Sequence, residues 1–191
     1  MTLQTNYLKK VGNDLLDFAT KRRDIIKQTG DALHFSKRAI FAMHRDDMKE
    51  AGIKLKEAEK IFKDLNKKYA RDARVQEEGS YKAGLEEYVE AVLLHQFLNT
   101  GKIGEIKGLP ISGESYVAGL CDVPGELYRY AIKSATSRNV EMVKRCNEMA
   151  QQITGELIEF NLTSYLRNKF DQAKSAVQKI EQVVYELSLT K

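Results

Sequence analysis

The chain of 191 residues is long enough for one domain with a hydrophobic core, and we expect a single domain over residues 1–191. Its composition, 42% hydrophobic and 30% charged, is ordinary for a globular protein, and no apolar run approaches the roughly 18–20 residues of a membrane span. The N-terminus has no signal-peptide pattern, and Cys121 and Cys146 lack the spacing of a metal site. We therefore expect a cytoplasmic protein with free thiols and no membrane partner.

The net charge of +4 is unevenly distributed along the chain. Residues 1–74 hold 18 Lys and Arg against 11 Asp and Glu, residues 75–130 hold 4 against 9, and residues 131–191 hold 9 against 7. A basic segment before an acidic one favours nucleic-acid binding near an acidic site, because Lys and Arg neutralise phosphates. The alternative interpretation is a solvated, Lys-rich helix surface.

The first part of the chain predicts two helices. Apolar residues recur at helical spacing from Leu8 to Ile40, which predicts one long helix over residues 5–45 that tolerates Gly12 and Gly30. Residues 47–68 predict a second, Lys-rich helix. The basic residues that we expect to contact nucleic acid are Arg22, Arg23, Lys37, Arg38, Arg45, Arg71 and Arg129. Since few aromatic residues accompany them, we expect contacts to phosphates rather than base stacking.

A third predicted helix, residues 75–100, carries a pair of carboxylates. Glu87 and Glu90 are spaced i,i+3 and share one helix face. Glu90 also shares its face with the apolar residues that follow it, so we expect it to be partly buried and to need a cation or a hydrogen-bond partner. Glu86, one position away, is expected in solvent. His95 could be a fifth ligand or a general base, but a lone histidine is more often a satisfied, partly buried side chain.

A loop and a second carboxylate pair follow. Residues 101–113 hold four glycines and a proline, which predicts a loop. Asp122 and Glu126 then come at i,i+4 spacing. A purely structural interpretation is available, in which Asp122 is the N-cap of a helix, Pro124 lies in its first turn, and Glu126 pairs with Arg129. The two interpretations are compatible, because a cap residue can also ligate a metal.

Two more helices complete an all-α prediction of about six or seven helices. Apolar residues at 4-3 spacing run from Val143 to Phe160 and again from Leu166 to Leu187, with cap-type residues at 161–164 between them. Such a pattern predicts two successive antiparallel helices. No segment of useful length alternates with the period of a strand.

The four carboxylates Glu87, Glu90, Asp122 and Glu126 would surround one point if their helices lay side by side. Four hard oxygen ligands suit Mg²⁺ or Mn²⁺. Such ions promote phosphodiester cleavage by activating a water molecule and neutralising the developing charge. The two motifs therefore predict a metal-dependent site for phosphodiester cleavage.

The sequence resembles the translin family, and within it the branch of translin-associated factor X (TRAX). Residues 23–45, 86–92, 116–127 and 179–188 carry the resemblance, including Glu-Tyr-Val-Glu at 87–90 and Asp-Val-Pro-Gly-Glu at 122–126. The resemblance implies a seven-helix-type fold, a hollow octamer that binds RNA or DNA inside, and in this branch a Mg²⁺-dependent endoribonuclease. Its catalytic and metal-binding carboxylates match Glu87, Glu90 and Asp122, and Glu126 fits as the fourth. Translin itself is a noncatalytic, nucleic-acid-binding subunit that lacks the first pair and the Asp.

The chain departs from the family in several respects. Val123-Pro124 replaces the usual Leu-Thr, and we expect the proline to shift the helix start and the aim of Asp122. The loop between the motifs is shorter than in larger relatives. A chain of this kind resembles archaeal-type members and suggests a homo-octamer that does not require a translin-type partner. Two alternatives stay open: a noncatalytic nucleic-acid-binding module and a helical scaffold for other proteins.

Overall fold

The computed structural model describes residues 3–189, so residues 1, 2, 190 and 191 of the expected domain lie outside it. The helices in this range are α1 (Thr5–His44), α2 (Met48–Lys68), α3 (Arg74–Glu77), α4 (Gly79–Thr100), α5 (Gly113–Thr136), α6 (Val140–Ile158) and α7 (Ser164–Leu189). No strand occurs within residues 3–189, which confirms the all-α prediction.

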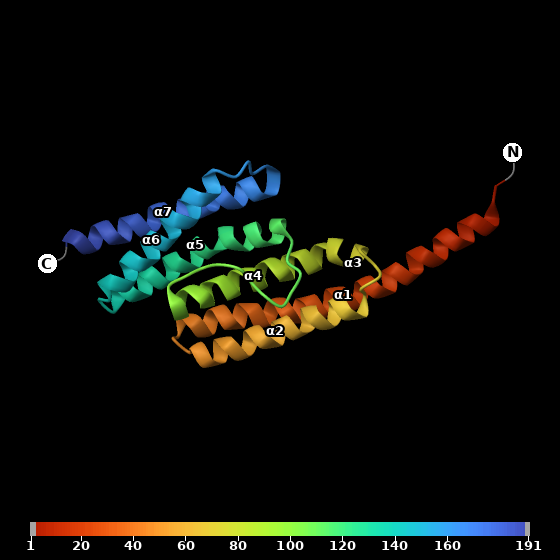
Figure 1. The fold of residues 1–191 in the computed structure, drawn as a ribbon, viewed down its shortest axis with the longest axis horizontal. Helices are drawn as coiled ribbons and strands as arrows, with labels where there is room; N and C mark the ends of the chain where they lie inside the picture. The colour runs from red at the N-terminus through yellow and green to blue at the C-terminus, as the bar shows by residue number, and fades with distance from the viewer. Residues whose placement is uncertain (1–2, 190–191) are drawn as a thin grey trace.

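The helices pack in layers, with α4 and α5 at the centre (Figure 1). Helix α4 packs against α1 on one side and against α5 on the other, while α5 also packs against α6 and α7. Helix α4 is buried on several faces, with Tyr88, Val89, Leu93 and Leu94 almost inaccessible to solvent. A helix that is apolar over most of its circumference belongs in the interior. The facing sides of α4 and α5 are therefore inside the bundle.

Two glycines let α4 approach its neighbours closely. A Cβ atom added to Gly119 of α5 would lie 2.6 Å from Cγ1 of Val89 and 2.7 Å from the carbonyl oxygen of Glu86. A Cβ atom added to Gly84 of α4 would lie 3.2 Å from the carbonyl oxygen of Thr29 in α1. Gly119 therefore lets α5 approach α4 along the segment that carries the predicted carboxylates, and Gly84 lets α4 approach α1.

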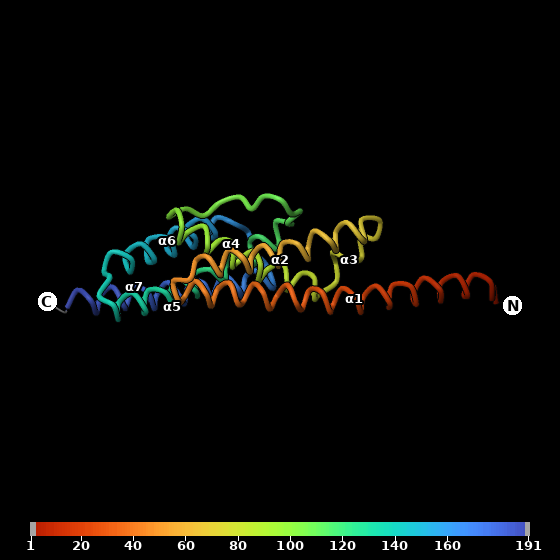
Figure 2. The backbone as a smooth tube through the Cα atoms, turned by 90° about the horizontal axis from the view of Figure 1, so that it is seen from below, coloured from red at the N-terminus to blue at the C-terminus, as the bar shows by residue number. Residues whose placement is uncertain are grey.

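The long predicted N-terminal helix is confirmed, but only part of it enters the core. The first buried residue of α1 is Ile25, and the preceding turns project beyond the bundle (Figures 1 and 2). Leu8, Val11 and Leu15 of the predicted apolar stripe are 48%, 37% and 63% exposed. The projecting half of α1, residues 5–24, therefore carries an apolar face that this chain does not cover.

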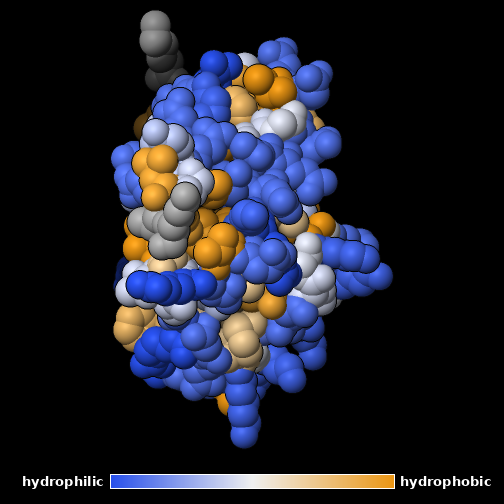
Figure 3. Space-filling view, turned by 90° about the vertical axis from the view of Figure 1, so that its left-hand side faces the viewer, coloured by the Kyte–Doolittle hydropathy of each residue, from blue (hydrophilic) through white to orange (hydrophobic). Residues whose placement is uncertain are grey.

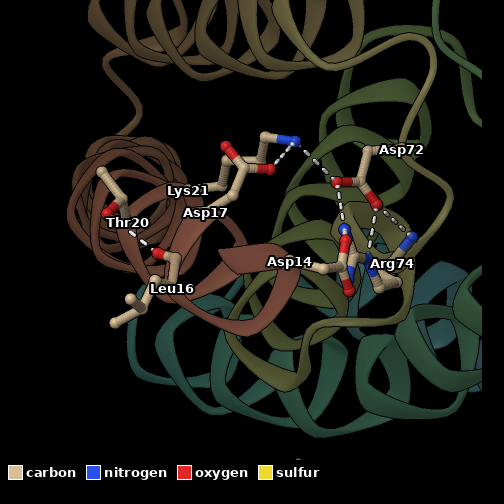
Figure 4. A network of polar contacts seen from close by, with 7 residues as sticks. All are labelled: Asp14, Leu16, Asp17, Thr20, Lys21, Asp72 and Arg74. Atoms are coloured by element: carbon tan, nitrogen blue, oxygen red, sulfur yellow. Dashed lines mark hydrogen bonds and ion pairs between the residues drawn. The ribbon is translucent and has the colours of Figure 1, made fainter. Parts of the chain in front are cut away.

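An ion-pair network fastens this part of α1 to the segment that follows α2 (Figure 4). Nζ of Lys21 lies 2.6 Å from Asp17 and 3.0 Å from Asp72. The guanidinium of Arg74 lies 2.8 Å from Asp72 and 3.0 Å from Asp14. The hydrogen bonds from Arg74 and Lys21 hold the pKa of Asp72 well below its usual range. The network connects the base of the projecting helix to the bundle.

The opposite end of the molecule also exposes apolar side chains. Seen from the end at which α7 finishes, a mostly hydrophilic surface is interrupted by hydrophobic patches (Figure 3). A groove of about 180 Å³ between α6 and α7 is lined mainly by Val140, Val143, Val184 and Leu187. None of the helices in the described part of the chain is long and apolar enough to cross a membrane.

The predicted helix over residues 75–100 is wrong at its start. The chain forms the short α3 first, becomes extended at Glu78 (φ −65°, ψ 128°), and begins α4 at Gly79. The last two predicted helices correspond to α6 and α7, which run antiparallel (Figure 1). Asn139 caps α6 by accepting a hydrogen bond from the backbone N–H of Met142.

The predicted N-cap role of Asp122 is wrong, because α5 begins at Gly113. Ser112 is the actual N-cap, and its Oγ accepts a hydrogen bond from the backbone N–H of Ser115 at 3.1 Å. Pro124 lies inside the helix, where it can donate no hydrogen bond to the preceding turn. The proline therefore does not shift the helix start, and Asp122 and Glu126 project from one continuous helix face.

Candidate active site

The four predicted carboxylates lie along the contact between α4 and α5. Glu87 and Glu90 come from α4, and Asp122 and Glu126 come from α5. Burial raises the pKa of Glu87 and that of Glu90, and the negative charges of Asp122 and Glu126 raise both further. This mutual influence means that the fold brings the two predicted pairs together.

Glu90 is the most buried of the four. Its side chain is 8% exposed and makes no hydrogen bond or ion pair with another residue of the described chain. Burial raises its pKa to about 9, with further contributions from the charges of Asp122, Glu87 and Glu126. The predicted burial of Glu90 is confirmed, and this buried carboxylate lacks a close counter-charge.

Glu87 and Glu126 each face a cationic group. Nζ of Lys37 lies 3.7 Å from Oε2 of Glu87. Nε2 of His44 lies 2.5 Å from Oε2 of Glu126, and Nη1 of Arg129 lies 2.9 Å from its Oε1. Burial would raise the pKa of Glu126, but the hydrogen bond from His44 and the charge of Arg129 outweigh it, so this pKa is lowered. The predicted pairing of Glu126 with Arg129 is confirmed.

Asp122 faces a cation from the last helix. Nζ of Lys169 in α7 forms an ion pair with Oδ2 of Asp122 and lies 3.4 Å from Oε2 of Glu86. The hydroxyl of Tyr165 donates a hydrogen bond to the same Oε2 at 2.6 Å. The side chain of Glu86 is only 12% exposed, so its predicted solvent exposure is wrong. The reason is that Tyr165 and Lys169 of α7 lie against it.

Sequence reasoning assigned no role to His44 or Lys169. His44 follows Lys37 by seven residues, so both occupy the same face of α1. Lys169 directly precedes Phe170 of the apolar stripe of α7, a position at the edge of the buried face. These positions are the sequence features from which His44 and Lys169 could have been recognised. His95 instead contacts Asn99 at 3.1 Å, and burial alone lowers its pKa, so it does not belong to the carboxylate site.

Four of the predicted basic residues lie near the C-terminal end of α1 or beside the carboxylates. Lys37 and Arg129 contact Glu87 and Glu126 as described and are 60% and 55% exposed. Arg38 and Arg45 both reach Glu50 of α2, at 3.2 Å and 2.9 Å.

The other three lie elsewhere. Arg22 is held by Glu78 at 2.9 Å, and Arg22 and Arg23 lie roughly 22 Å along the axis of α1 from Lys37. Arg71 lies in the segment after α2 and lines a cavity there with Lys67.

An exposed aromatic ring lies beside the site. Phe41 is 56% exposed and lies on α1 between Lys37 and His44, both of which contact candidate carboxylates. The guanidinium of Arg45 is 4.7 Å from the centre of the ring. Phe41 thus offers a flat apolar surface next to the carboxylates, although the scarcity of aromatic residues argued against base stacking.

The four acidic side chains are of the chemical type that binds divalent cations. Four carboxylates lie along the contact between α4 and α5, and Glu90 is buried and makes no ion pair with a described residue, so a bound cation would supply the partner that it lacks. Within residues 3–189, no three His, Cys, Asp or Glu side chains stand in an arrangement that could hold a metal ion. Glu87, Asp122 and Glu126 are instead directed toward Lys37, Lys169 and Arg129 of the chain itself.

The two cysteines are structural. Cys121 and Cys146 are free and buried, as expected. Burial raises their thiol pKa values to about 11 and about 12. Neither thiol is therefore activated as a nucleophile.

Fold and site together define an all-α bundle with a carboxylate cluster between its two central helices. The Translin family profile matches residues 20–191, so this chain belongs to the translin family. The Translin-associated protein X homolog of Schizosaccharomyces pombe is 25% identical over 91% of this chain and 83% of its own length. An uncharacterized protein of Methanocaldococcus jannaschii is 28% identical over 92% of this chain and 79% of its own length.

Solved structures share the fold. AfC3PO is 21% identical and superposes with a TM-score of 0.88, covering 97% of this chain and 98% of that chain. The structure of AfC3PO in complex with duplex RNA is 20% identical with a TM-score of 0.85 and the same coverage. These similarities confirm the predicted translin-like architecture.

Proposed function

We propose that this chain is a metal-dependent endoribonuclease of the TRAX-like branch, of the archaeal, homo-oligomeric type. The observation that carries the proposal is the placement of four carboxylates along the contact between α4 and α5, close enough to influence one another's charge, with Glu90 buried and in no ion pair with a described residue. The similarity to the Translin-associated protein X homolog supports the branch, and the AfC3PO complex with duplex RNA supports RNA as the ligand.

Each carboxylate has a role in this proposal. Glu87, Glu90, Asp122 and Glu126 would hold one or two Mg²⁺ or Mn²⁺ ions. When bound, such an ion supplies an activated water molecule and neutralises charge on the scissile phosphate. Glu90 would meet the ion from its buried position, and Glu87 and Glu126 would turn toward it from Lys37 and His44.

That rearrangement frees basic side chains at the site. Lys37 and Arg129 are more than half exposed and lie beside Glu87 and Glu126. Once released, their charged groups face the position of the phosphate backbone and neutralise it. The ring of Phe41 provides a surface on which an unpaired base stacks.

The remaining basic residues extend the nucleic-acid path. Arg38 and Arg45 lie at the same end of α1, whereas Arg22, Arg23 and Arg71 would meet a longer ligand. Such phosphate contacts carry little sequence information, so DNA is a second candidate ligand. A hollow homo-octamer would place these surfaces around the nucleic acid, without need of a translin-type partner.

One observation favours a noncatalytic alternative. Glu87, Asp122 and Glu126 already pair with Lys37, Lys169 and Arg129, which is what acids in purely structural ion pairs do. In this alternative the protein binds nucleic acid in the manner of translin and does not cut it.

Cleavage of a labelled single-stranded RNA tests the proposal. We expect cutting with Mg²⁺, none with EDTA, and a loss of at least about 100-fold in Asp122→Asn with the fold retained. Asp171→Asn is the control, because Asp171 is an exposed acid that pairs with Lys174 on α7. Normal cutting by Asp122→Asn would refute the site, and RNA retained uncut by the wild type would favour the noncatalytic alternative.

A further inference from the structure

Lys169 is a lysine in an unusual environment. Its side chain is 14% exposed and lies between Asp122 of α5 and Glu86 of α4. Lysine side chains normally keep their ammonium group in water, and a buried ammonium is costly unless it is paired. Here the ammonium joins the last helix to the two helices that carry the candidate carboxylates.

Lys169 has anchors that do not depend on Asp122. Its Nζ lies 3.4 Å from Oε2 of Glu86 and 5.4 Å from the centre of the Tyr165 ring. The Tyr165 hydroxyl donates to the same oxygen of Glu86 at 2.6 Å, which fixes that carboxylate. Glu86 and Tyr165 therefore keep the ammonium in place when Asp122 takes on another ligand.

Lys169 contacts one of the two oxygens of the Asp122 carboxylate. Lys169 pairs with Oδ2, while Oδ1 makes no hydrogen bond or ion pair with any described residue. The side chain of Asp122 is 29% exposed, so its second oxygen has access to a ligand. An ammonium that fixes one oxygen of a carboxylate orients the other.

We propose that Lys169, supported by Glu86 and Tyr165, is a positioning residue that aims Asp122 at the metal. The inference rests on the proposed function, because it concerns the same site. Groups behind a metal ligand fix its orientation, and their loss typically costs about 10–100-fold in metal affinity or activity. A cation that merely occupied Asp122 in place of the metal would have the opposite effect, since its removal would tighten metal binding.

Binding of Mn²⁺ to the RNA-free protein, followed by electron paramagnetic resonance, measures this effect without relying on activity. We expect Lys169→Met to bind Mn²⁺ about 10–100-fold more weakly than the wild type. In the cleavage assay the same variant should lose kcat while its KM for RNA stays close to the wild-type value. Lys174→Met is the matched control, because Lys174 lies on the same helix, is 43% exposed and pairs with Asp171.

The outcomes separate the two proposals. Wild-type protein that neither binds Mn²⁺ nor cuts RNA refutes the proposed function and this inference with it. Wild-type binding and cutting, together with unchanged or tighter Mn²⁺ binding by a folded Lys169→Met, overturns the inference alone. If Lys169→Met does not fold, Mn²⁺ binding is measured on Tyr165→Phe instead. Weaker Mn²⁺ binding by this variant supports the positioning role, and unchanged binding overturns it.

Discussion

The buried side chain of Glu90 makes the stability of the metal-free protein depend on pH. Its pKa is raised from 4.5 to about 9, so the folded protein retains a proton that the unfolded chain has already released. The free energy of unfolding therefore falls as the pH rises from about 4.5 toward 9. The pKa of Glu87 is raised as well, so Glu87 contributes in the same direction.

Replacing Glu90 with Gln removes most of this dependence. In EDTA at pH 8 we expect Glu90→Gln to be more stable than the wild type by about 1–3 kcal/mol, because the amide is neutral in both states, whereas the wild-type carboxyl must take up a proton on folding. The difference should shrink as the pH falls and vanish below pH 4.5, where the carboxyl is protonated in both the folded and the unfolded state. Urea unfolding at the two pH values measures it, with exposed Glu105→Gln as the control. Equal stability of Glu90→Gln and wild type at pH 8 would contradict the assignment.

The side chains of the site were predictable where local geometry decides their position. The i,i+3 and i,i+4 spacings placed Glu87 with Glu90 and Asp122 with Glu126, because helix periodicity is a local property. The cationic partners were not predictable in this way. Lys169 follows Asp122 by 47 residues, and the contact depends on how α7 packs on α5, which no local spacing specifies.

At the scale of elements, α5 contains a local helix-start pattern that tertiary packing overrides. Asp122 followed by Pro124 is a good helix start, yet the helix begins at Gly113. Residues before Asp122, among them Ala118, Gly119 and Cys121, are buried, and α5 packs along α4, α6 and α7. That burial compensates for the hydrogen bond that Pro124 cannot make.

The close approach of α4 and α5 depends on Gly119, and two glycine substitutions separate this role from helix propensity. Gly119→Ala should destabilise the protein by about 1–3 kcal/mol, because its Cβ would meet Val89 and the backbone of Glu86. In Gly30→Ala of α1 the added Cβ atom would have no neighbour within 4 Å, so this substitution should stabilise the protein by about 0.5–1 kcal/mol. Urea unfolding of both variants measures the difference. If Gly119→Ala were as stable as Gly30→Ala, the close contact would not be a constraint.

At the scale of the whole molecule, helix number and order followed from periodicity, whereas the projection of α1 did not. The apolar stripe looked continuous from Leu8 to Ile40, but only its second half meets this chain's core. A sequence pattern does not distinguish a face that packs within the chain from one that packs against another chain.

The projecting half of α1 predicts self-association. We expect the purified chain to form an oligomer, with an octamer as the expected size, and the double substitution of Leu8 and Leu15 by Glu to lower its mass. Size-exclusion chromatography with light scattering measures the mass. Ile53→Glu is the control, since Ile53 is a 49% exposed residue of α2. A monomeric wild type, or equal effects of the two sets of substitutions, would contradict the prediction.

In the proposed site, Glu87, Glu90, Asp122 and Glu126 together hold a divalent cation between α4 and α5. The most direct test is the anomalous scattering of Mn²⁺ in crystals of the full chain grown with that ion. We expect a peak about 2–2.3 Å from oxygens of these carboxylates, with Lys37 and His44 displaced from their partners. The absence of a peak there, at a Mn²⁺ concentration that supports RNA cleavage, would contradict it.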